Sequence, residues 1–393
     1  MSFPPVRTIT LGLADPHPLS FKSIKYAADT LQKASARYAQ AGYEVQTVRL
    51  STRPVLDDLA DWSHDALLHY AQELQRMLDD VELSFCSLGP AQAARPDFPL
   101  ERINLIADML AATTAINMTV QLATPDYAPR REAALHSARV MKRLALETPE
   151  GFGNFRFAVL ACVAPGCPFF PTAYHDGPTS LAIGTQSAGI VADAIQSLRQ
   201  HTSQPLDLEV ASERIQHALI ERLTPVVTLG QQFASEQQMA FGGIDLSPAP
   251  LADDSIAGAL EMCDYGHIGA PGTVAVAAAL TYALKHTNLP TCGYCGIMLP
   301  VLEDAILGKR WQEGLLHTHQ LLLYSAVCGT GLDTIPLPGD TGEEEIAHLL
   351  LDVATLAKRL NKPLSARLFP VPGKQAGEPT TFTSPYLTNT VVR

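Results

Sequence analysis

The chain has 393 residues, of which 47% are hydrophobic and 17% are charged, and its formal net charge is −12. An acidic chain without clusters of Lys and Arg is not expected to bind nucleic acid, because phosphates need clustered cations. No stretch reaches the roughly 18 apolar residues of a membrane span, so we expect no membrane partner either.

The cysteines and the amino terminus bear on the compartment. The seven cysteines are an odd number, and the opening MSFPPVRTITLGL lacks the basic and apolar regions of a signal peptide. Free thiols without a signal peptide favour a reducing, cytoplasmic setting. The apolar, weakly charged composition also predicts a closed, symmetric homo-oligomer.

Strands and helices are predicted to alternate through the first half of the chain. Apolar or alternating runs predict strands at 7–13, 44–50, 84–88, 116–123 and 156–163. Helical spacing of apolar residues predicts helices at 21–41, 65–78, 100–112 and 132–146. Apolar strands between helices favour an α/β fold whose sheet is mostly parallel and covered on both faces.

The second half repeats this alternation. Strands are predicted at 180–186, 242–246, within 325–336 and at 365–369, and helices at 187–201, 212–238 and 273–285. Another helix follows Thr341, where Thr341 and Glu344 have the spacing of a capping box. No linker divides the chain, so we expect one domain over residues 1–393; two domains meeting near residue 200 are the alternative.

The first candidate site is the segment APGCPFFPTAYHDGP at 164–178, directly after a predicted strand. Ligand sites in α/β proteins gather at the carboxyl ends of strands, and prolines stiffen the segment. Cys167 would be a nucleophile and His175 its base, with Tyr174 or Asp176 as the orienting group. The alternative is a rigid loop whose Cys167 and phenylalanines fill the core.

The second candidate is a glycine-rich loop before the helix at 273–285. Gly266, Gly269 and Gly272 lead into Thr273, and free backbone N–H groups at a helix start can hold an anion. The loop has neither a Walker A nor a GxGxxG pattern. The alternative is close helix packing that glycine permits.

Further polar residues follow predicted strands. Asp245 and Asp333 would face a ligand, Asp340 precedes a helix, and Arg367 would clamp an anion. Turns, helix caps and solvated surface are the competing roles. The pair Cys292 and Cys295 forms a lone CxxC, for which two packed thiols are the favoured interpretation.

The motifs GFGNFRFA, PGCPFFPTAYHDG, FGGIDLSPAP, GAPGT, GLDTIPLPGDT and RLFPVPGK occur in this order over nearly the whole chain. Together they resemble the family called domain of unknown function 711, or uncharacterised protein family 0210. The resemblance implies the fold of pyruvate formate-lyase and anaerobic ribonucleotide reductase: a ten-stranded α/β barrel with helices outside and a loop inside. The glycyl-radical motif of those enzymes is missing around Gly373, so the resemblance does not imply radical chemistry.

Three functions follow from these features. The first is a non-radical enzyme that acts on a small anionic metabolite through Cys167, His175 and Tyr174. Its expected binding residues are Asp176, Asp245, Gly269, Gly272, Thr273, Asp333, Asp340 and Arg367. The second is a metabolite-binding protein without catalysis. The third is a metal-dependent hydrolase or lyase that uses His175, Asp176, Asp245 and His267; otherwise no cofactor is predicted.

Overall fold

Nine strands form one mixed sheet in the computed structural model, which describes residues 5–250 and 254–393. Their order across the sheet is β7-β6-β1-β2-β3-β4-β5-β9-β8. Neighbouring strands are parallel except for the pairs β1–β6 and β5–β9. The strands are β1 (Val6–Gly12), β2 (Val48–Ser51), β3 (Cys86–Ala91), β4 (Ile116–Ala123), β5 (Phe157–Ala161), β6 (Ser180–Thr185), β7 (Ala240–Asp245), β8 (Gly331–Pro338) and β9 (Leu364–Val371).

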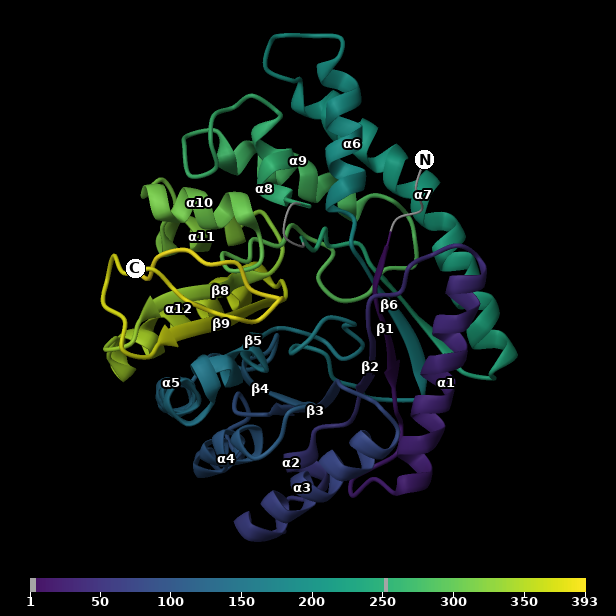
Figure 1. Ribbon diagram of the computed structural model, residues 1–393, viewed down its shortest axis with the longest axis vertical. Helices are drawn as coiled ribbons and strands as arrows, with labels where there is room; N and C mark the ends of the chain where they lie inside the picture. Colours follow the sequence, from purple (N-terminus) through teal and green to yellow (C-terminus); the bar gives the residue numbers. More distant parts are fainter. Residues whose placement is uncertain (1–4, 251–253) are drawn as a thin grey trace.

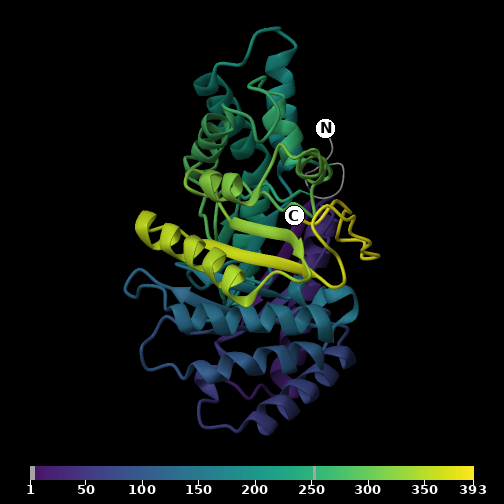
Figure 2. The same cartoon turned by 90° about the vertical axis from the view of Figure 1, so that its left-hand side faces the viewer.

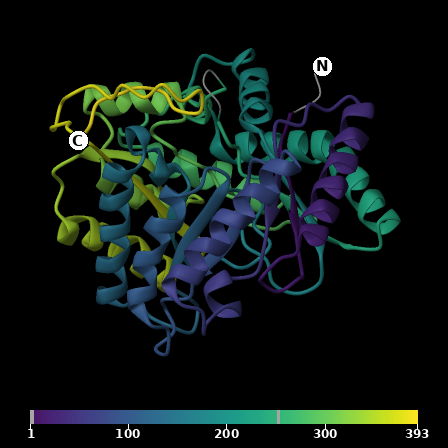
Figure 3. The same cartoon turned by 60° about the horizontal axis from the view of Figure 1, so that its bottom comes forward.

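The helices connect these strands and cover the outer side of the sheet (Figure 1). They are α1 (Phe21–Gln40), α2 (Val55–Asp58), α3 (His64–Asp80), α4 (Leu105–Ala111), α5 (Arg131–Glu147), α6 (Ala188–Arg199), α7 (Leu208–Glu236), α8 (Ile256–Glu261), α9 (Thr273–Lys285), α10 (Ala305–Glu313), α11 (Thr318–Ser325) and α12 (Glu343–Leu360). Two short 3-10 helices, η1 (Leu100–Asn104) and η2 (Pro149–Phe155), complete the pattern. Helices of the first 150 residues lie in a row, purple to blue, in Figure 3.

The two faces of the sheet differ in chemistry, because successive side chains of a strand point to opposite sides. One face is apolar and belongs to the large core that includes the helices; its members include Ile9, Leu50, Cys86, Ile116, Met118, Val120, Phe157, Val159, Leu364 and Ala366. The residues between them are buried but largely polar, and they include Thr8, Thr10, Arg49, Ser51, Ser87, Asn117, Thr119, Gln121, Ser365 and Arg367. A buried polar face needs hydrogen-bond partners, so it is where a site can form.

The segment after α9 contacts both edges of the sheet. Thr291 forms an isolated parallel bridge with Ile244 of β7, and Pro300 forms one with Asp333 of β8. Between these two bridges the described chain has no regular strand. The structure therefore has nine strands in its described part where the family resemblance implied ten.

Helix α12 lies beside α5 (Figure 2), and ion pairs join them on the surface. Arg131 contacts Glu344 at 2.8 Å and Arg139 contacts Glu343 at 3.1 Å. The predicted capping box of α12 is wrong. Gly342 occupies the N-cap position without a side-chain cap, and the Thr341 hydroxyl donates to Pro338 O instead. Glu344 is thus free to form its ion pair with Arg131.

Other expected elements differ in extent. The strand predicted at 44–50 is reduced to β2, and the helix predicted at 100–112 is divided into η1 and α4. Helices α2, α8, α10 and α11 were not predicted, because they are short and their apolar residues show little periodicity. None of the described helices is long and apolar enough to cross a membrane.

Candidate functional site

The loop after β5, residues 162–179, lies against the polar face of the sheet. Three side chains of that face donate hydrogen bonds to its backbone: Thr10 to Pro168 O at 2.8 Å, Ser87 to Ala173 O at 2.5 Å and Gln121 to Val163 O at 3.2 Å. These residues come from β1, β3 and β4. The loop is therefore fixed at several points by strands distant in the sequence.

Cys167 is buried in this loop among apolar side chains that include Leu160, Tyr294 and Met298. Its Sγ lies 3.6 Å from the Thr172 hydroxyl, and no base in the described part of the chain hydrogen-bonds to it. Burial raises the pKa of the Cys167 thiol to about 12. A protonated thiol is a poor nucleophile, so these contacts favour a packing role; catalysis by Cys167 stays a prediction.

His175 and Tyr174 are also bonded within the loop region. The Nε2 atom of His175 lies 3.2 Å from Gly177 O and 3.0 Å from Pro178 O, and the Tyr174 hydroxyl donates to Val163 O at 2.9 Å. No hydrogen bond joins Cys167 and His175 among the described residues. Asp176 is exposed. The expected catalytic group is thus present in one loop but is not assembled around the thiol.

A cavity of about 70 Å³ lies beside the loop, between the polar face and the segment after α9. Its volume is enough for roughly five water molecules. Charged side chains reach it from four strands and from the segment before α10: Arg7, Arg49, Glu303, Asp333 and Arg367. Phenylalanine rings, Tyr294 and several hydroxyl and amide groups form the rest of its wall; the rings are Phe85, Phe155, Phe169 and Phe170. This mixed polar and aromatic lining is typical of a small-molecule site.

Arg49 of β2 is the charge in this cavity that lacks an anionic partner. Its guanidinium lies 5.1 Å from the ring centre of Phe85 and 5.2 Å from that of Phe170, and its Nε donates to Thr47 at 3.0 Å. Neither terminal nitrogen has a hydrogen-bond or ion-pair partner among the described residues, although the side chain is 8% exposed. Burial, with the nearby charge of Arg7, lowers the pKa of Arg49 to about 9, and the attraction of Glu303, with which Arg49 forms no ion pair, only partly opposes this. It is therefore still charged at neutral pH.

The other charges of the cavity are paired. Arg367 Nη2 lies 2.5 Å from Glu303 and Nε lies 2.6 Å from Asp333, while Arg7 lies 3.9 Å from Glu303. Burial alone would lower the pKa of Arg367, but the two carboxylates outweigh it and raise that pKa. Burial raises the pKa of Glu303, opposed by Arg367. Three arginines facing two carboxylates leave one positive charge unbalanced, and it resides on Arg49.

Two hydroxyls on the cavity wall are buried without a partner. The Tyr294 side chain is 5% exposed, and its oxygen makes no hydrogen bond of good geometry among the described residues; the Ser365 and Thr172 hydroxyls are near enough to oppose the rise of its pKa that burial causes. Thr330 is 3% exposed, and its Oγ1 also has no partner. Unpaired buried polar groups are uncommon in native proteins and call for a water or a ligand.

Asp245 lies at the end of β7 and is fully buried. Its carboxylate accepts hydrogen bonds from the backbone N–H groups of Ser247, Tyr294 and Cys295 and from the Ser247 hydroxyl. Burial raises the pKa of this carboxyl, and the hydrogen bonds oppose the rise. Asp245 thus holds in place the turn that carries Tyr294, and its acceptor sites are directed to the protein itself.

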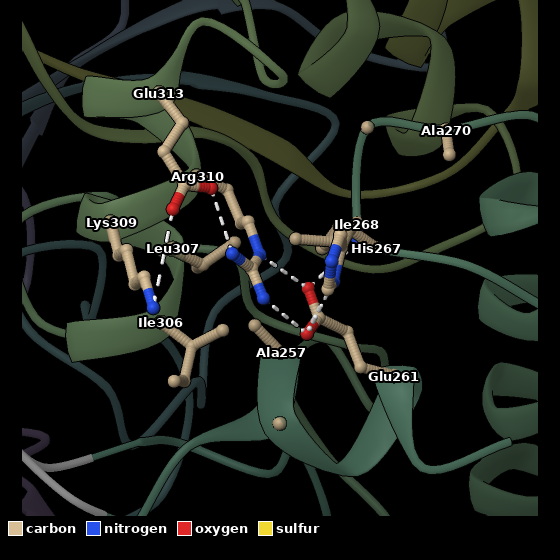
Figure 4. Close-up of polar contacts among 12 residues, drawn as sticks. Ala257, Glu261, His267, Ile268, Ala270, Ile306, Leu307, Lys309, Arg310 and Glu313 are labelled. Carbon is tan, nitrogen blue, oxygen red and sulfur yellow. Dashed lines mark hydrogen bonds and ion pairs between the residues drawn. The ribbon is translucent and has the colours of Figure 1, made fainter. Parts of the chain in front are cut away.

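None of the glycine-rich loop's residues lines the cavity. Figure 4 shows Glu261 of α8 between Arg310 of α10 and the loop residues His267 and Ile268. The Glu261 carboxylate accepts hydrogen bonds from Ile268 N at 3.0 Å and from Arg310 at 2.7 and 2.8 Å, and contacts His267 at 3.1 Å. The Gly269 N–H donates to the Thr273 hydroxyl. The Gly269 N–H, which was expected to help hold an anion, therefore already has a partner in the protein.

Further contacts fix the surroundings of that loop. A Cβ on Gly269 would lie 2.0 Å from Leu315 O, which shows how closely the two segments pack, and Gly272 has a φ of 105° before α9. These observations favour the packing alternative for both glycines.

The remaining candidates, Asp340, Cys292 and Cys295, do not line the cavity. Asp340 is exposed in the turn before α12. Cys292 and Cys295 are free thiols, and Cys295 Sγ lies 3.3 Å from Cys292 O. Within residues 5–250 and 254–393, no three His, Cys, Asp or Glu side chains gather closely enough to hold a metal ion.

Sequence reasoning selected Asp333 and Arg367, which do line the cavity, but missed Arg7, Arg49, Tyr294 and Glu303. Arg49 stands in the run TVRLS, whose alternation of polar and apolar residues marks a strand. A charged residue inside such a strand, between Val48 and Leu50, indicates that one face of the sheet is polar. The polar residues of β4 at Asn117, Thr119 and Gln121 carry the same signal.

The chain is similar to proteins of one family over most of its length. The family model described as "Uncharacterised ACR (DUF711)" matches residues 4–383. A UPF0210 protein of Pyrobaculum arsenaticum is 30% identical over 372 residues, which are 89% of this chain and 79% of the relative. One from Desulforudis audaxviator is 28% identical, over 95% of this chain and 87% of the relative.

One solved structure is distantly similar. It is the anaerobic ribonucleotide reductase from Thermotoga maritima in complex with dATP and CTP, with 8% sequence identity and a TM-score of 0.39. The match covers 92% of this chain and 75% of the reductase. At this score the similarity implies nothing about activity or ligand.

Proposed function

The chain belongs to the DUF711 family, as its motifs indicated, and we propose that it binds a small organic anion in the cavity around Arg49. The observation that carries this proposal is the buried guanidinium of Arg49, whose terminal nitrogens have no partner among the described residues. An uncompensated buried charge costs several kcal/mol. Binding of an anion would offset this cost, so the retained charge favours an anion-binding role.

The aromatic neighbours of Arg49 support this role. Phe85 and Phe170 lie near its guanidinium, and such cation–π contacts each contribute about 0.5–2 kcal/mol. They hold the charge in position but do not neutralise it. The planar fork of terminal nitrogens then remains available for a carboxylate, which it matches with two parallel hydrogen bonds.

The barrel architecture belongs to the same proposal. We infer that residues 291–300 take the tenth position and close the sheet around the loop after β5. The bridges Thr291–Ile244 and Pro300–Asp333 support this closure, since they connect the segment to both edge strands. A closed wall would shield the cavity from water and strengthen its electrostatic interactions.

Binding is proposed ahead of catalysis by the loop. The high pKa of Cys167 and the bonding of His175 to loop carbonyls leave the thiol without a base. Nothing in these contacts favours thiol chemistry over packing. The expected small anionic ligand is kept in the proposal, with Arg49 in place of the Cys167 loop as its main contact.

A thermal-shift screen of the full chain against small carboxylates and inorganic phosphate tests the proposal. A ligand at about 100 times its Kd should add about 2.7 kcal/mol to the free energy of unfolding. Arg49→Gln should remove this stabilisation, because the glutamine amide carries no positive charge to attract the anion.

The matched control is Arg156→Gln. Arg156 is also a buried arginine, but it donates to the carbonyls of Ile116 and Leu110 and does not line the cavity. That variant should be less stable and still respond to the ligand. An anion response that survives in Arg49→Gln would show that the proposed contact is wrong.

A further inference from the structure

We propose that the ligand of the cavity is a small hydroxylated monocarboxylate, held by Arg49 through its carboxylate and by Tyr294 and Thr330 through its hydroxyl. This inference rests on the proposed anion-binding function and deepens it. Four features of the cavity carry it: the balance of charges, the two terminal nitrogens of Arg49, the two unpaired hydroxyls and the volume.

The charge balance favours a single carboxylate. Glu303 and Asp333 already pair with Arg367, and Glu303 also faces Arg7. One positive charge is left over among the described lining residues, and a monoanion would neutralise it. A phosphate dianion would leave an excess negative charge in a buried site, which is unfavourable without a second free cation.

The presentation of Arg49 favours a planar anion. Its Nε already donates to Thr47. The ring of Phe85, directly before β3, and that of Phe170, in the loop after β5, lie near the guanidinium. The two terminal nitrogens are the donors that remain. They form a fork that fits the two oxygens of one carboxylate.

The unpaired hydroxyls predict a second polar group on the ligand. Tyr294 and Thr330 both line the cavity, and their buried hydroxyls have no hydrogen-bond partner of good geometry among the described residues. Each can donate or accept one hydrogen bond, and a ligand hydroxyl can do both at once. A ligand hydroxyl that reaches these groups would satisfy buried hydrogen-bonding capacity, whereas an apolar ligand would leave both unpaired.

The volume limits the size of the ligand. A cavity of about 70 Å³ holds roughly five waters, which corresponds to about six non-hydrogen atoms. A three-carbon hydroxy acid has this size. Lactate, 3-hydroxypropionate, propionate, methyl lactate and inorganic phosphate are therefore suitable probes, because they vary the hydroxyl and the charge separately.

Isothermal titration calorimetry of the full chain with these probes tests the inference. At least one of the two hydroxy acids should bind at least tenfold more tightly than propionate, while the neutral ester and phosphate should bind far more weakly. In Tyr294→Phe and in Thr330→Val the ratio of hydroxy-acid to propionate affinity should fall toward one. Either variant suffices if the other fails to fold.

Tyr265→Phe is the control for loss of a phenol. Its hydroxyl donates to Leu206 O at 3.0 Å outside the cavity, so the affinity ratio should stay as in the parent chain. Equal binding of propionate and both hydroxy acids, or a ratio unchanged in Tyr294→Phe and Thr330→Val, would overturn this inference and leave the anion proposal standing. Tight binding of phosphate, without binding of any carboxylate, would also overturn this inference and leave the anion proposal standing. Absence of binding by every anion would overturn both.

Discussion

The guanidinium of Arg49 lies 5.2 Å from the ring centre of Phe170, which brings a charge on β2 against the loop that follows β5. The two residues are far apart in sequence, and they form one wall of the cavity. The loop therefore contributes to the site through an aromatic ring, whereas its thiol and imidazole are bonded elsewhere.

Phe170→Leu should weaken anion binding without abolishing it. Leucine keeps the wall apolar but removes one cation–π contact, a loss of about 1 kcal/mol or about fivefold in Kd. Calorimetry with the tightest anion of the screen measures it. An unchanged Kd would mean that Phe170 does not position Arg49.

Arg49→Met should raise the free energy of unfolding of the ligand-free chain by about 1 kcal/mol, because it removes a buried charge without an anionic partner. The gain is limited by loss of the contacts to Phe85 and Phe170. Urea denaturation without added anions measures it. A clearly less stable variant would show that Arg49 is compensated in the free protein.

Arg367→Met should destabilise the chain by about 3–5 kcal/mol, because it leaves Glu303 and Asp333 buried without their shared cation. The loss should shrink as the pH falls, since the two uncompensated carboxylates can then bind protons. Arg139→Met is the control, because its ion pair with Glu343 is on the surface and contributes at most about 1 kcal/mol. Equal losses in the two variants would contradict the burial argument.

Cys167 should react slowly with iodoacetamide in the folded chain. Burial raises its pKa to about 12, so the thiolate is scarce throughout pH 6–9, and the side chain is also shielded from reagent. Peptide mapping after timed alkylation at several pH values compares it with the partly exposed Cys162. Rapid labelling of Cys167 with a plateau near neutral pH would restore the nucleophile hypothesis.

His17 should make stability depend on pH. Burial lowers the pKa of His17 to about 4, from an ordinary value of 6.5; its ring contacts Tyr70 and Thr52. The unfolded chain therefore binds more protons between pH 6.5 and 4, so stability is fully present above pH 6.5 and is lost as the pH falls toward 4. The total is up to about 3 kcal/mol.

The comparison variant for this dependence is His17→Gln, which does not titrate. As the pH falls from 7 to 4, the parent chain should lose more unfolding free energy than the variant does. Parallel curves over that range would contradict a neutral, buried His17.

The sequence predicted the α/β alternation and most strand positions because local periodicity records which residues face the core. Helix α12 was located by the stripe that contains Ile346, Leu350 and Val353. Its start was misassigned, since Thr341 hydrogen-bonds to the preceding turn. Short helices such as α8 and α10 depend on tertiary contacts, for example Asp304 with Ser255, and leave little periodic signal.

The sequence by itself determined the fold class, the family and the presence of a stiff, reactive-looking loop after β5. Only the tertiary structure decided which of its polar groups are already satisfied. Asp245, Gly269 and His175 have partners within the protein, whereas Arg49, Tyr294 and Thr330, which all line the cavity, keep polar atoms without a hydrogen-bond partner among the described residues. The reason is physical: hydrogen bonding and charge pairing join residues distant along the chain, and no local pattern records which partner each one finds.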